Sequence, residues 1–236
     1  MEVAGEGRGI VTILTIATHD WVDAHLVRWV RRVRESNPSA RLVVLLVGDG
    51  SVPVPDEVDD VRVYGQETWS REWCNEVRMG ATTLLGEDAV LYCDCDADIV
   101  GSLACLEADV DGKTLGCCAS PTVHGEWYRM CRHFKFADAE PYMNNGLLWL
   151  TDDWTERYKR AWGMLAGLDV NPRIAGSVAF NLMLRYEEGE WARLPDEYGC
   201  IWSDVRGLRA ANVIQFCNDI GQKKRVTLER IWRAAQ

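Results

Sequence analysis

The sequence predicts an α/β protein with a mostly parallel central sheet flanked by helices. The chain has 236 residues, a length that suits one α/β domain. Its composition, 47% hydrophobic and 26% charged, is that of an ordinary globular protein. Through the first hundred residues, short β-branched runs alternate with helical patterns, which is the element order of an open, doubly wound sheet. We therefore expect one domain over residues 1–236.

The first elements form a strand–helix–strand unit. Residues 10–16, IVTILTI, are typical of a buried strand. An apolar stripe over residues 21–35 predicts a helix capped by Asp20. Residues 41–47, RLVVLLV, predict a second buried strand. A crossover of this length joins parallel strands in a right-handed unit.

The alternation continues to the middle of the chain. Residues 61–64 predict a third strand, residues 70–85 a helix that ends at Gly86, and residues 89–93 a fourth buried strand. The fourth strand leads directly into the acidic segment 94–98, DCDAD. Ligands of doubly wound sheets bind beyond the carboxyl ends of the strands, so this segment lies where a ligand is expected.

The second half of the chain is less regular, and it shows no linker or internal repeat. Its hydrophobic patterns predict three strands and two helices. The strands are expected at residues 115–119, 146–150 and 213–216, and the helices at residues 153–165 and 177–186.

Charge and composition exclude several classes of protein. The net charge of −10 disfavours duplex nucleic acid as a partner, because an acidic surface repels a polyanion. No apolar run reaches the 18 residues of a membrane span, and the acidic residues 1–7 do not resemble a signal peptide. The nine cysteines are odd in number and irregularly spaced, which predicts free thiols. We expect a soluble, cytoplasmic protein that has no membrane partner.

The acidic segment is the clearest candidate site. Asp94, Asp96 and Asp98 alternate, and on an extended backbone alternate side chains point to one side. Carboxylates that lie so close together repel one another, and a cation relieves this repulsion. Oxygen ligands suit Mg²⁺ or Mn²⁺, and Mg²⁺ commonly combines one or two carboxylates with substrate phosphates. The competing interpretation is an acidic loop that water solvates.

At these residues the chain resembles the GT-A glycosyltransferases. In that family a D-x-D motif ends a central strand, and VLYCDCD at residues 90–96 is similar to it. A second register, DADIV at residues 96–100, is also compatible, and we favour the first. The resemblance implies a Rossmann-like GT-A domain that transfers a sugar from a nucleotide-diphosphate sugar, with UDP as the expected nucleotide. It also implies Mn²⁺ or Mg²⁺ on the diphosphate, held by Asp94 and Asp96 with Asp98 as a neighbour.

Other segments, in the same order, resemble the glycogenin-like, family 8-type branch. Residues 143–150 are similar to its F-N-x-G strand on the acceptor side, residues 177–184 to its D-Q-x-x-L-N helix, and residues 213–224 to its closing element. The resemblance implies a nucleotide-sugar half at about residues 10–100 and an acceptor half at about residues 101–225. The implied donor-binding residues are Ala17, Thr18, Arg78, Asp94 and Lys223, and the implied metal ligands are Asp94, Asp96, Asp98 and Gln215.

Two departures from this branch leave the stereochemistry of transfer open. Gln215 stands where the family has a metal-binding histidine, and Gly176-Ser177 stand where it has an Asp-Gln pair associated with retaining transfer. An inverting enzyme needs a carboxylate base, for which Asp138 is our candidate among several loop acids. Asn145 offers a sugar hydroxyl both a donor and an acceptor, although Asn-Gly is also a common turn.

The acceptor remains open between a protein, a glycan and a modified nucleobase. Two other functions also remain. One is a non-catalytic module of the same fold that binds a nucleotide sugar or a partner. The other is a sugar-phosphate nucleotidyltransferase, against which residues 15–20 lack the glycine-rich phosphate loop. Several aromatic residues are candidates for stacking on a sugar ring: Trp127, Tyr128, Trp149, Trp191 and Trp202.

Overall fold

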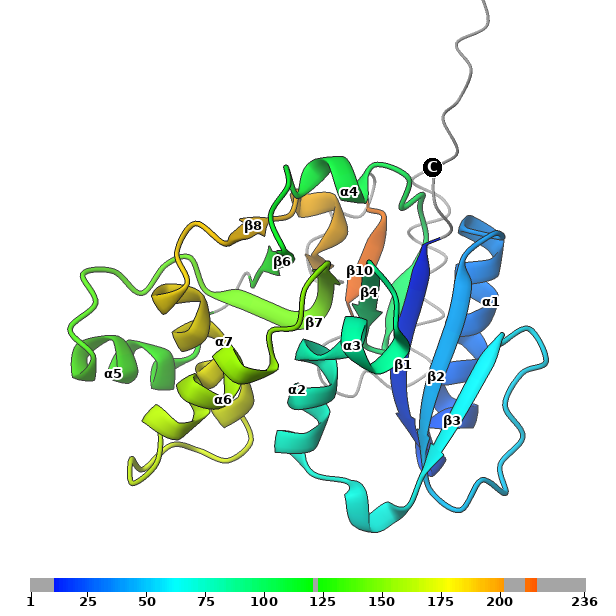
Figure 1. Cartoon of the computed structure of the whole chain (residues 1–236), viewed down its shortest axis with the longest axis horizontal. Coiled ribbons are helices and arrows are strands. Elements are labelled where there is room, and N and C mark those ends of the chain that lie inside the picture. Colours follow the sequence, from blue (N-terminus) through cyan, green and yellow to red (C-terminus); the bar gives the residue numbers. More distant parts are fainter. Residues whose placement is uncertain (1–10, 121–122, 202–210, 216–236) are drawn as a thin grey trace, which may run out of the picture.

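The computed structural model describes residues 11–120, 123–201 and 211–215, and its centre is a seven-stranded sheet (Figure 1). The strand order is β3-β2-β1-β4-β7-β6-β8. Within this sheet β7 runs antiparallel to both of its neighbours, and the other paired strands are parallel. The strands are β1 (Thr12–Thr18), β2 (Arg41–Val47), β3 (Asp60–Tyr64), β4 (Val90–Cys93), β6 (Leu115–Ala119), β7 (Met143–Leu150) and β8 (Trp191–Arg193). The predicted fold class, an α/β protein with a mostly parallel sheet, is confirmed.

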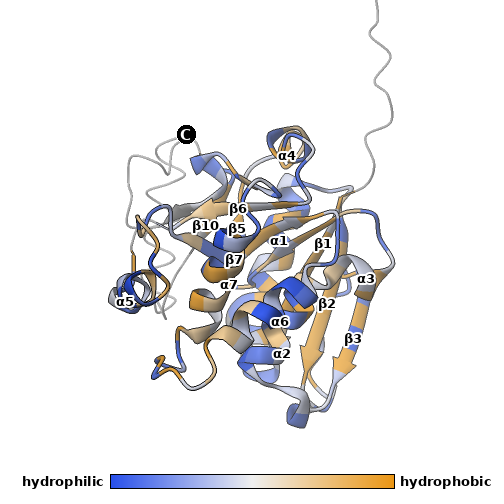
Figure 2. Cartoon of the chain, turned by 60° about the vertical axis from the view of Figure 1, so that its left-hand side comes forward, coloured by the Kyte–Doolittle hydropathy of each residue, from blue (hydrophilic) through white to orange (hydrophobic). Residues whose placement is uncertain are grey.

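Helices cover both faces of this sheet. They are α1 (Val27–Ser36), α2 (Arg71–Met79), α3 (Ala81–Leu85), α4 (Leu106–Asp109), α5 (Gly125–His133), α6 (Thr155–Met164) and α7 (Ala175–Tyr186). Alternate side chains of β1 divide between the two layers: Leu14 and Ile16 pack with α2, α6 and α7, whereas Ile13 and Ala17 pack with α1. Figure 2 shows the apolar central strands and the hydrophilic residues on the outer helices.

A second, three-stranded sheet lies on the α1 side. Its order is β5-β10-β9, formed by β5 (Ala97–Ile99), β10 (Val213–Gln215) and β9 (Cys200–Ile201). β5 begins four residues after the end of β4 and pairs antiparallel with β10. The chain therefore leaves one sheet and enters another within the acidic segment.

The strands predicted at residues 41–47 and 115–119 have those bounds in the structure. β7 begins earlier than predicted, because Met143 and Asn144 pair with β6 beyond a bulge. The predicted helix 70–85 is divided at Gly80, where a Cβ atom would lie 2.6 Å from Thr155 Oγ1 of α6. The prediction that Asp20 caps a helix is wrong, because Asp20 lies within a 3₁₀ turn, His19–Trp21.

Several elements were missed because they are short or carry a weak pattern: β5, α4, α5, β8 and β9. The last predicted strand is confirmed over β10, while Phe216 lies outside the described residues. Cysteines with described side chains are free thiols, at positions 74, 93, 95, 105, 117, 118 and 131. Among the described residues, no helix has both the length and the apolar character needed to cross a membrane.

Asn181 joins α7 to the beginning of β7. Its Oδ1 accepts a hydrogen bond of 2.6 Å from the Met143 backbone N–H, and its Nδ2 donates one of 2.9 Å to the Met143 carbonyl. The side chain is buried, so these backbone groups depend on it for their hydrogen bonds. This contact fixes the start of β7 against α7.

Replacing Asn181 by alanine leaves buried backbone groups without partners. We expect Asn181→Ala to lower the free energy of unfolding by roughly 2 to 4 kcal/mol, measured by urea denaturation. Asn171→Ala is the control, because Asn171 bonds the Arg173 backbone N–H at an exposed position where water can replace it. Equal stability of the two variants would contradict this role of Asn181.

Candidate functional site

A cavity of about 1090 Å³ opens at the carboxyl ends of the parallel strands. Its floor is formed by residues near or just beyond the ends of β1, β2 and β4, and its walls by α2, the start of β7 and the start of α7. This is the edge at which doubly wound sheets bind ligands, because the strand ends and the loops that follow them converge there. The candidate site therefore lies in this cavity.

Asp94 is held in the cavity by two neighbours. Its Oδ1 accepts hydrogen bonds from Arg78 Nη2 at 2.8 Å and from the Tyr92 hydroxyl at 2.5 Å. The Arg78 guanidinium also lies 4.8 Å from the centre of the Tyr92 ring. Burial raises the pKa of Tyr92 well above its usual value, so the phenol keeps its proton and donates to Asp94.

The same contacts keep Arg78 charged. Burial acts to lower the pKa of Arg78, but the charge of Asp94 raises it above its usual value. Asp94 Oδ2 points towards Gly146 of β7, where a Cβ atom would lie only 2.7 Å from it. The absence of a side chain at Gly146 thus leaves space for the second oxygen of Asp94.

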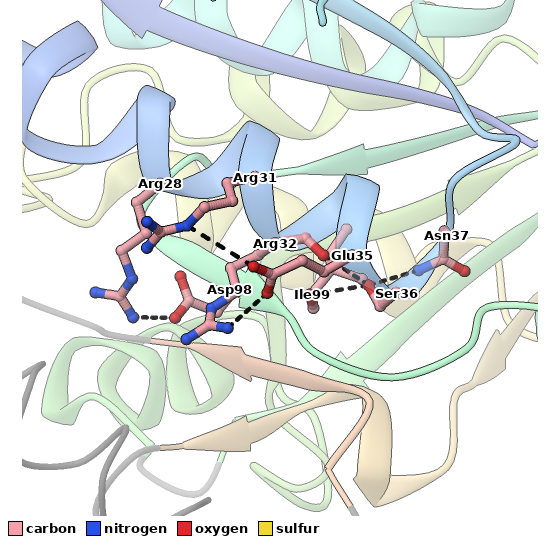
Figure 3. Close-up of polar contacts among 8 residues, drawn as sticks. All are labelled: Arg28, Arg31, Arg32, Glu35, Ser36, Asn37, Asp98 and Ile99. Carbon is pink, nitrogen blue, oxygen red and sulfur yellow. Dashed lines mark hydrogen bonds and ion pairs between the residues drawn. The ribbon is translucent and has the colours of Figure 1, made fainter.

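Asp96 and Asp98 are separated by the change of sheet. Asp96 lies in the turn after β4 and lines the cavity. Asp98 belongs to β5, is 4% exposed and forms an ion pair with Arg28 of α1 (Figure 3). It is not among the residues that line the cavity. The expectation that the three aspartates point to one side is wrong, because the backbone turns between Asp94 and Asp98 instead of remaining extended.

The strand-end side of the cavity is acidic. Asp20 and Asp49, which follow β1 and β2, line it together with Asp94 and Asp96. His19 Nδ1 lies 3.6 Å from Asp49 Oδ1. Among the described residues no group of three or more His, Cys, Asp or Glu side chains is arranged to hold a metal ion. Asp94 and Asp96 still fit a cation that takes its remaining oxygen ligands from a bound diphosphate.

The structure brings some of the other predicted residues to the cavity and not others. Thr18 and Asn145 line it, while Ala17 is buried in the core. Asp138, the candidate base, is exposed and does not line the cavity; its Oδ1 accepts a hydrogen bond from the Glu140 backbone N–H. The side chain of Gln215 and the whole of Lys223 lie outside the described residues.

One face of α2 forms a wall of the cavity. Arg71, Cys74, Asn75 and Arg78 all line it, and their spacing of three, four and seven residues places them on the same helix face. Of these residues, only Arg78 was predicted from the sequence to belong to the site. The helical period would also have indicated Arg71 and Asn75. Burial raises the pKa of Cys74 to about 11, so its thiol is protonated near neutral pH.

Asn75 orients Asn145. Asn75 Nδ2 donates a hydrogen bond of 2.7 Å to the Arg71 carbonyl, which leaves its Oδ1 to accept one of 3.0 Å from Asn145 Nδ2. No described residue bonds Asn145 Oδ1, which is therefore available to a ligand in the cavity.

Gly176 allows α7 to approach this pair of asparagines. A Cβ atom at position 176 would lie 2.5 Å from Asn75 Nδ2. Ser177 also lines the cavity, next to Tyr142. Burial raises the pKa of Tyr142 to about 12, and its contact with Ser177 opposes that rise. Gly176, which departs from the family pattern, thus allows α7 to pack closely on α2.

The aromatic residues at the cavity are not those that the sequence suggested. Trp21 and Trp69 line it, with exposed fractions of 42% and 41%. Trp127 and Trp149 are buried in the core. Trp21 and Trp69 follow the first and third strands. Their positions just beyond predicted strands were the feature of the sequence that could have identified them.

Comparisons with known proteins support the fold. No protein-family model and no curated protein matches the sequence. The solved structure of the galactosyltransferase LgtC, in complex with donor and acceptor sugar analogues, is similar over 95% of both chains, with a TM-score of 0.67 and 15% identity. Glycosyltransferase GlyE of Streptococcus pneumoniae TIGR4 is similar over 96% of this chain and 62% of its own, with a TM-score of 0.60 and 13% identity. The fold is GT-A.

The similarity in fold extends over nearly all of the chain. An active-site mutant of LgtC is similar over 96% of this chain and 100% of its own, with a TM-score of 0.64 and 17% identity. At these identities the comparisons show the GT-A fold, and the chemistry of the cavity must be argued from its own residues.

Gly146 provides a direct test of the Asp94 geometry. We expect Gly146→Ala to displace the Asp94 carboxylate, weaken its contact with Arg78 and lower the free energy of unfolding by about 1 to 3 kcal/mol. The measurement is denaturant unfolding. Gly163→Ala on α6 is the matched control, because its Cβ meets nothing within 4 Å and should stabilise the helix by about 0.5 to 1 kcal/mol. A neutral Gly146→Ala variant would contradict the described packing.

Proposed function

We propose that the protein is a metal-dependent glycosyltransferase that takes a sugar from a nucleotide-diphosphate sugar, with a UDP-sugar as the favoured donor. The observation that carries this proposal is the position of Asp94 and Asp96 together in a large cavity at the strand ends of a GT-A fold. Thr18, at the end of β1, is positioned to contact the nucleotide. The acceptor is a hydroxyl group on a protein, a glycan or a modified nucleobase.

Asp94 and Asp96 would hold Mn²⁺ or Mg²⁺ on the donor diphosphate. When bound, the cation neutralises the diphosphate and, as a Lewis acid, assists departure of the nucleoside diphosphate. Arg78 fixes the orientation of Asp94 and keeps a positive charge at the cavity wall. We propose Gln215 and Lys223, from the end of the chain, as a further ligand and a diphosphate contact. Asp98 is omitted from the ligand set because it pairs with Arg28.

Asn145 is proposed to bind a sugar hydroxyl. Its Nδ2 is held by Asn75, so its Oδ1 accepts a hydrogen bond from the ligand. A carboxylate base for an inverting reaction is not proposed at Asp138, because that residue is exposed outside the cavity. Asp20, Asp49 and Asp96 are the cavity carboxylates that do not contact Arg78.

The alternative functions predict the release of different products. A binding module would bind a nucleotide sugar without releasing nucleoside diphosphate. A sugar-phosphate nucleotidyltransferase would release pyrophosphate from a nucleoside triphosphate. Nucleoside diphosphate release from a panel of UDP-, GDP- and ADP-sugars with Mn²⁺ identifies a transferase. Pyrophosphate release from nucleoside triphosphates supplied with sugar 1-phosphates identifies a nucleotidyltransferase, and binding without either release identifies a module.

The metal site is tested at Asp96. We expect Asp96→Asn to weaken Mn²⁺-dependent UDP binding more than tenfold, because it removes the charge of one of the two carboxylate ligands of the cation. Binding is measured by titration calorimetry with and without EDTA. Asp56→Asn, at an exposed position outside the cavity, should bind normally. Full transfer by Asp96→Asn in the presence of EDTA would sink the metal mechanism.

Asn145→Ala separates a ligand contact from a structural one. We expect transfer to fall more than tenfold with little change in melting temperature, because water in the cavity can replace the bond to Asn75. Turnover and melting temperature are measured on the same preparation. A lower melting temperature combined with normal turnover would show that Asn145 serves only to pack β7 against α2.

A further inference from the structure

Two arginines come together in the wall of the cavity. Arg71 begins α2, Arg173 precedes α7, and both are exposed residues that line the cavity. Arg71 Nη1 donates a hydrogen bond of 2.5 Å to the Arg173 carbonyl, which joins positions 102 residues apart. Because the acceptor is a backbone oxygen, this contact neutralises neither positive charge.

Neither guanidinium has a carboxylate partner among the described residues. Other arginines among the described residues do have carboxylate partners: Arg34 pairs with Asp59, and Arg41 pairs with Glu87. Acidic residues outnumber basic ones by 36 to 26 over the whole sequence. Two adjacent, uncompensated arginines at a cavity wall therefore favour an anionic ligand.

The position of Arg71 indicates where the anionic group lies relative to the donor diphosphate. Seven residues separate Arg71 from Arg78, which is almost two helical turns, so both lie on the same face of α2 about 10 Å apart along its axis. Arg78 contacts Asp94, where the donor diphosphate is proposed to bind. Arg71 and Arg173 therefore face a part of the substrate that is remote from the diphosphate.

We propose that Arg71 and Arg173 bind a carboxylate or phosphate group on the acceptor, so that the preferred acceptor is an anionic sugar or glycan. This inference rests on the proposed function, since it names the acceptor of that transfer. The planar guanidinium of arginine matches both anions with two parallel hydrogen bonds. Trp69 lines the cavity two residues before Arg71 and offers an aromatic surface beside the anion site.

The test measures binding of matched sugars, so it does not depend on turnover. The full chain, with UDP and Mn²⁺ present, is titrated with the methyl glycosides of glucuronic and galacturonic acid, with those of glucose and galactose, and with the 6-phosphates of the last two sugars. We expect at least one anionic sugar to bind ten times more tightly than its neutral counterpart. Arg71→Gln and Arg173→Gln should each abolish most of that preference.

Arg132→Gln is the matched control. Arg132 is exposed on α5, lies outside the cavity and has no carboxylate partner among the described residues. Its substitution should leave the preference unchanged. Equal binding of anionic and neutral sugars by the wild type, or an equal loss in Arg132→Gln, overturns the proposal.

A second comparison separates the acceptor from the donor. UDP-glucuronic acid and UDP-glucose are titrated against the wild type and Arg71→Gln. A loss confined to UDP-glucuronic acid would place the anion on the donor and overturn the acceptor assignment. If the wild type binds anionic sugars but releases no UDP from any donor, the anion site is supported and the proposed transferase function is refuted.

Discussion

The contact of Asp94 with Arg78 and Tyr92 is the constraint around which the cavity is organised. Asp94 directly follows β4, and Arg78 belongs to α2, so their hydrogen bond joins the sheet edge to the helix that forms the opposite wall. Burial penalises the charge of Arg78, and the charge of Asp94 opposes that penalty. Gly146 on β7 leaves room for the second carboxylate oxygen. Three neighbouring elements are thus positioned by one side chain.

The face of α2 that bears Arg78 extends from a negatively charged end of the cavity to a positively charged one. At the strand ends Asp20, Asp49, Asp94 and Asp96 gather negative charge that a divalent cation can compensate. At the start of α2, Arg71 contributes positive charge beside Arg173. Between the two ends, Asn75 and Asn145 supply neutral hydrogen-bonding groups. A donor that carries a metal-bound diphosphate, together with an acceptor that carries the distant anion, would match this order.

The sequence was sufficient for the fold class because the strongest signals are local. The β-branched runs of β1 and β2 are each seven residues long and buried throughout most of their length. The site was only partly predictable, since Asp98 departs from its expected place through a turn and a second sheet that no local pattern indicates. Arg173 is likewise brought to Arg71 by the packing of α7 on α2, a contact between distant segments. Single-sequence periodicity contains no information about such contacts.

The pairing of β5 with β10 has a consequence for biosynthesis. β5 ends at Ile99, and its partner strand β10 begins at Val213, so 114 positions separate two strands that share one small sheet. At translation speeds of about 5 to 20 residues per second, the ribosome takes roughly 6 to 23 seconds to add that stretch. During this interval β5, which contains Asp98 of the acidic segment, has no β10 with which to pair. The nascent chain therefore contains β1, β2, β3 and β4 well before the partner strand of β5 has been synthesised.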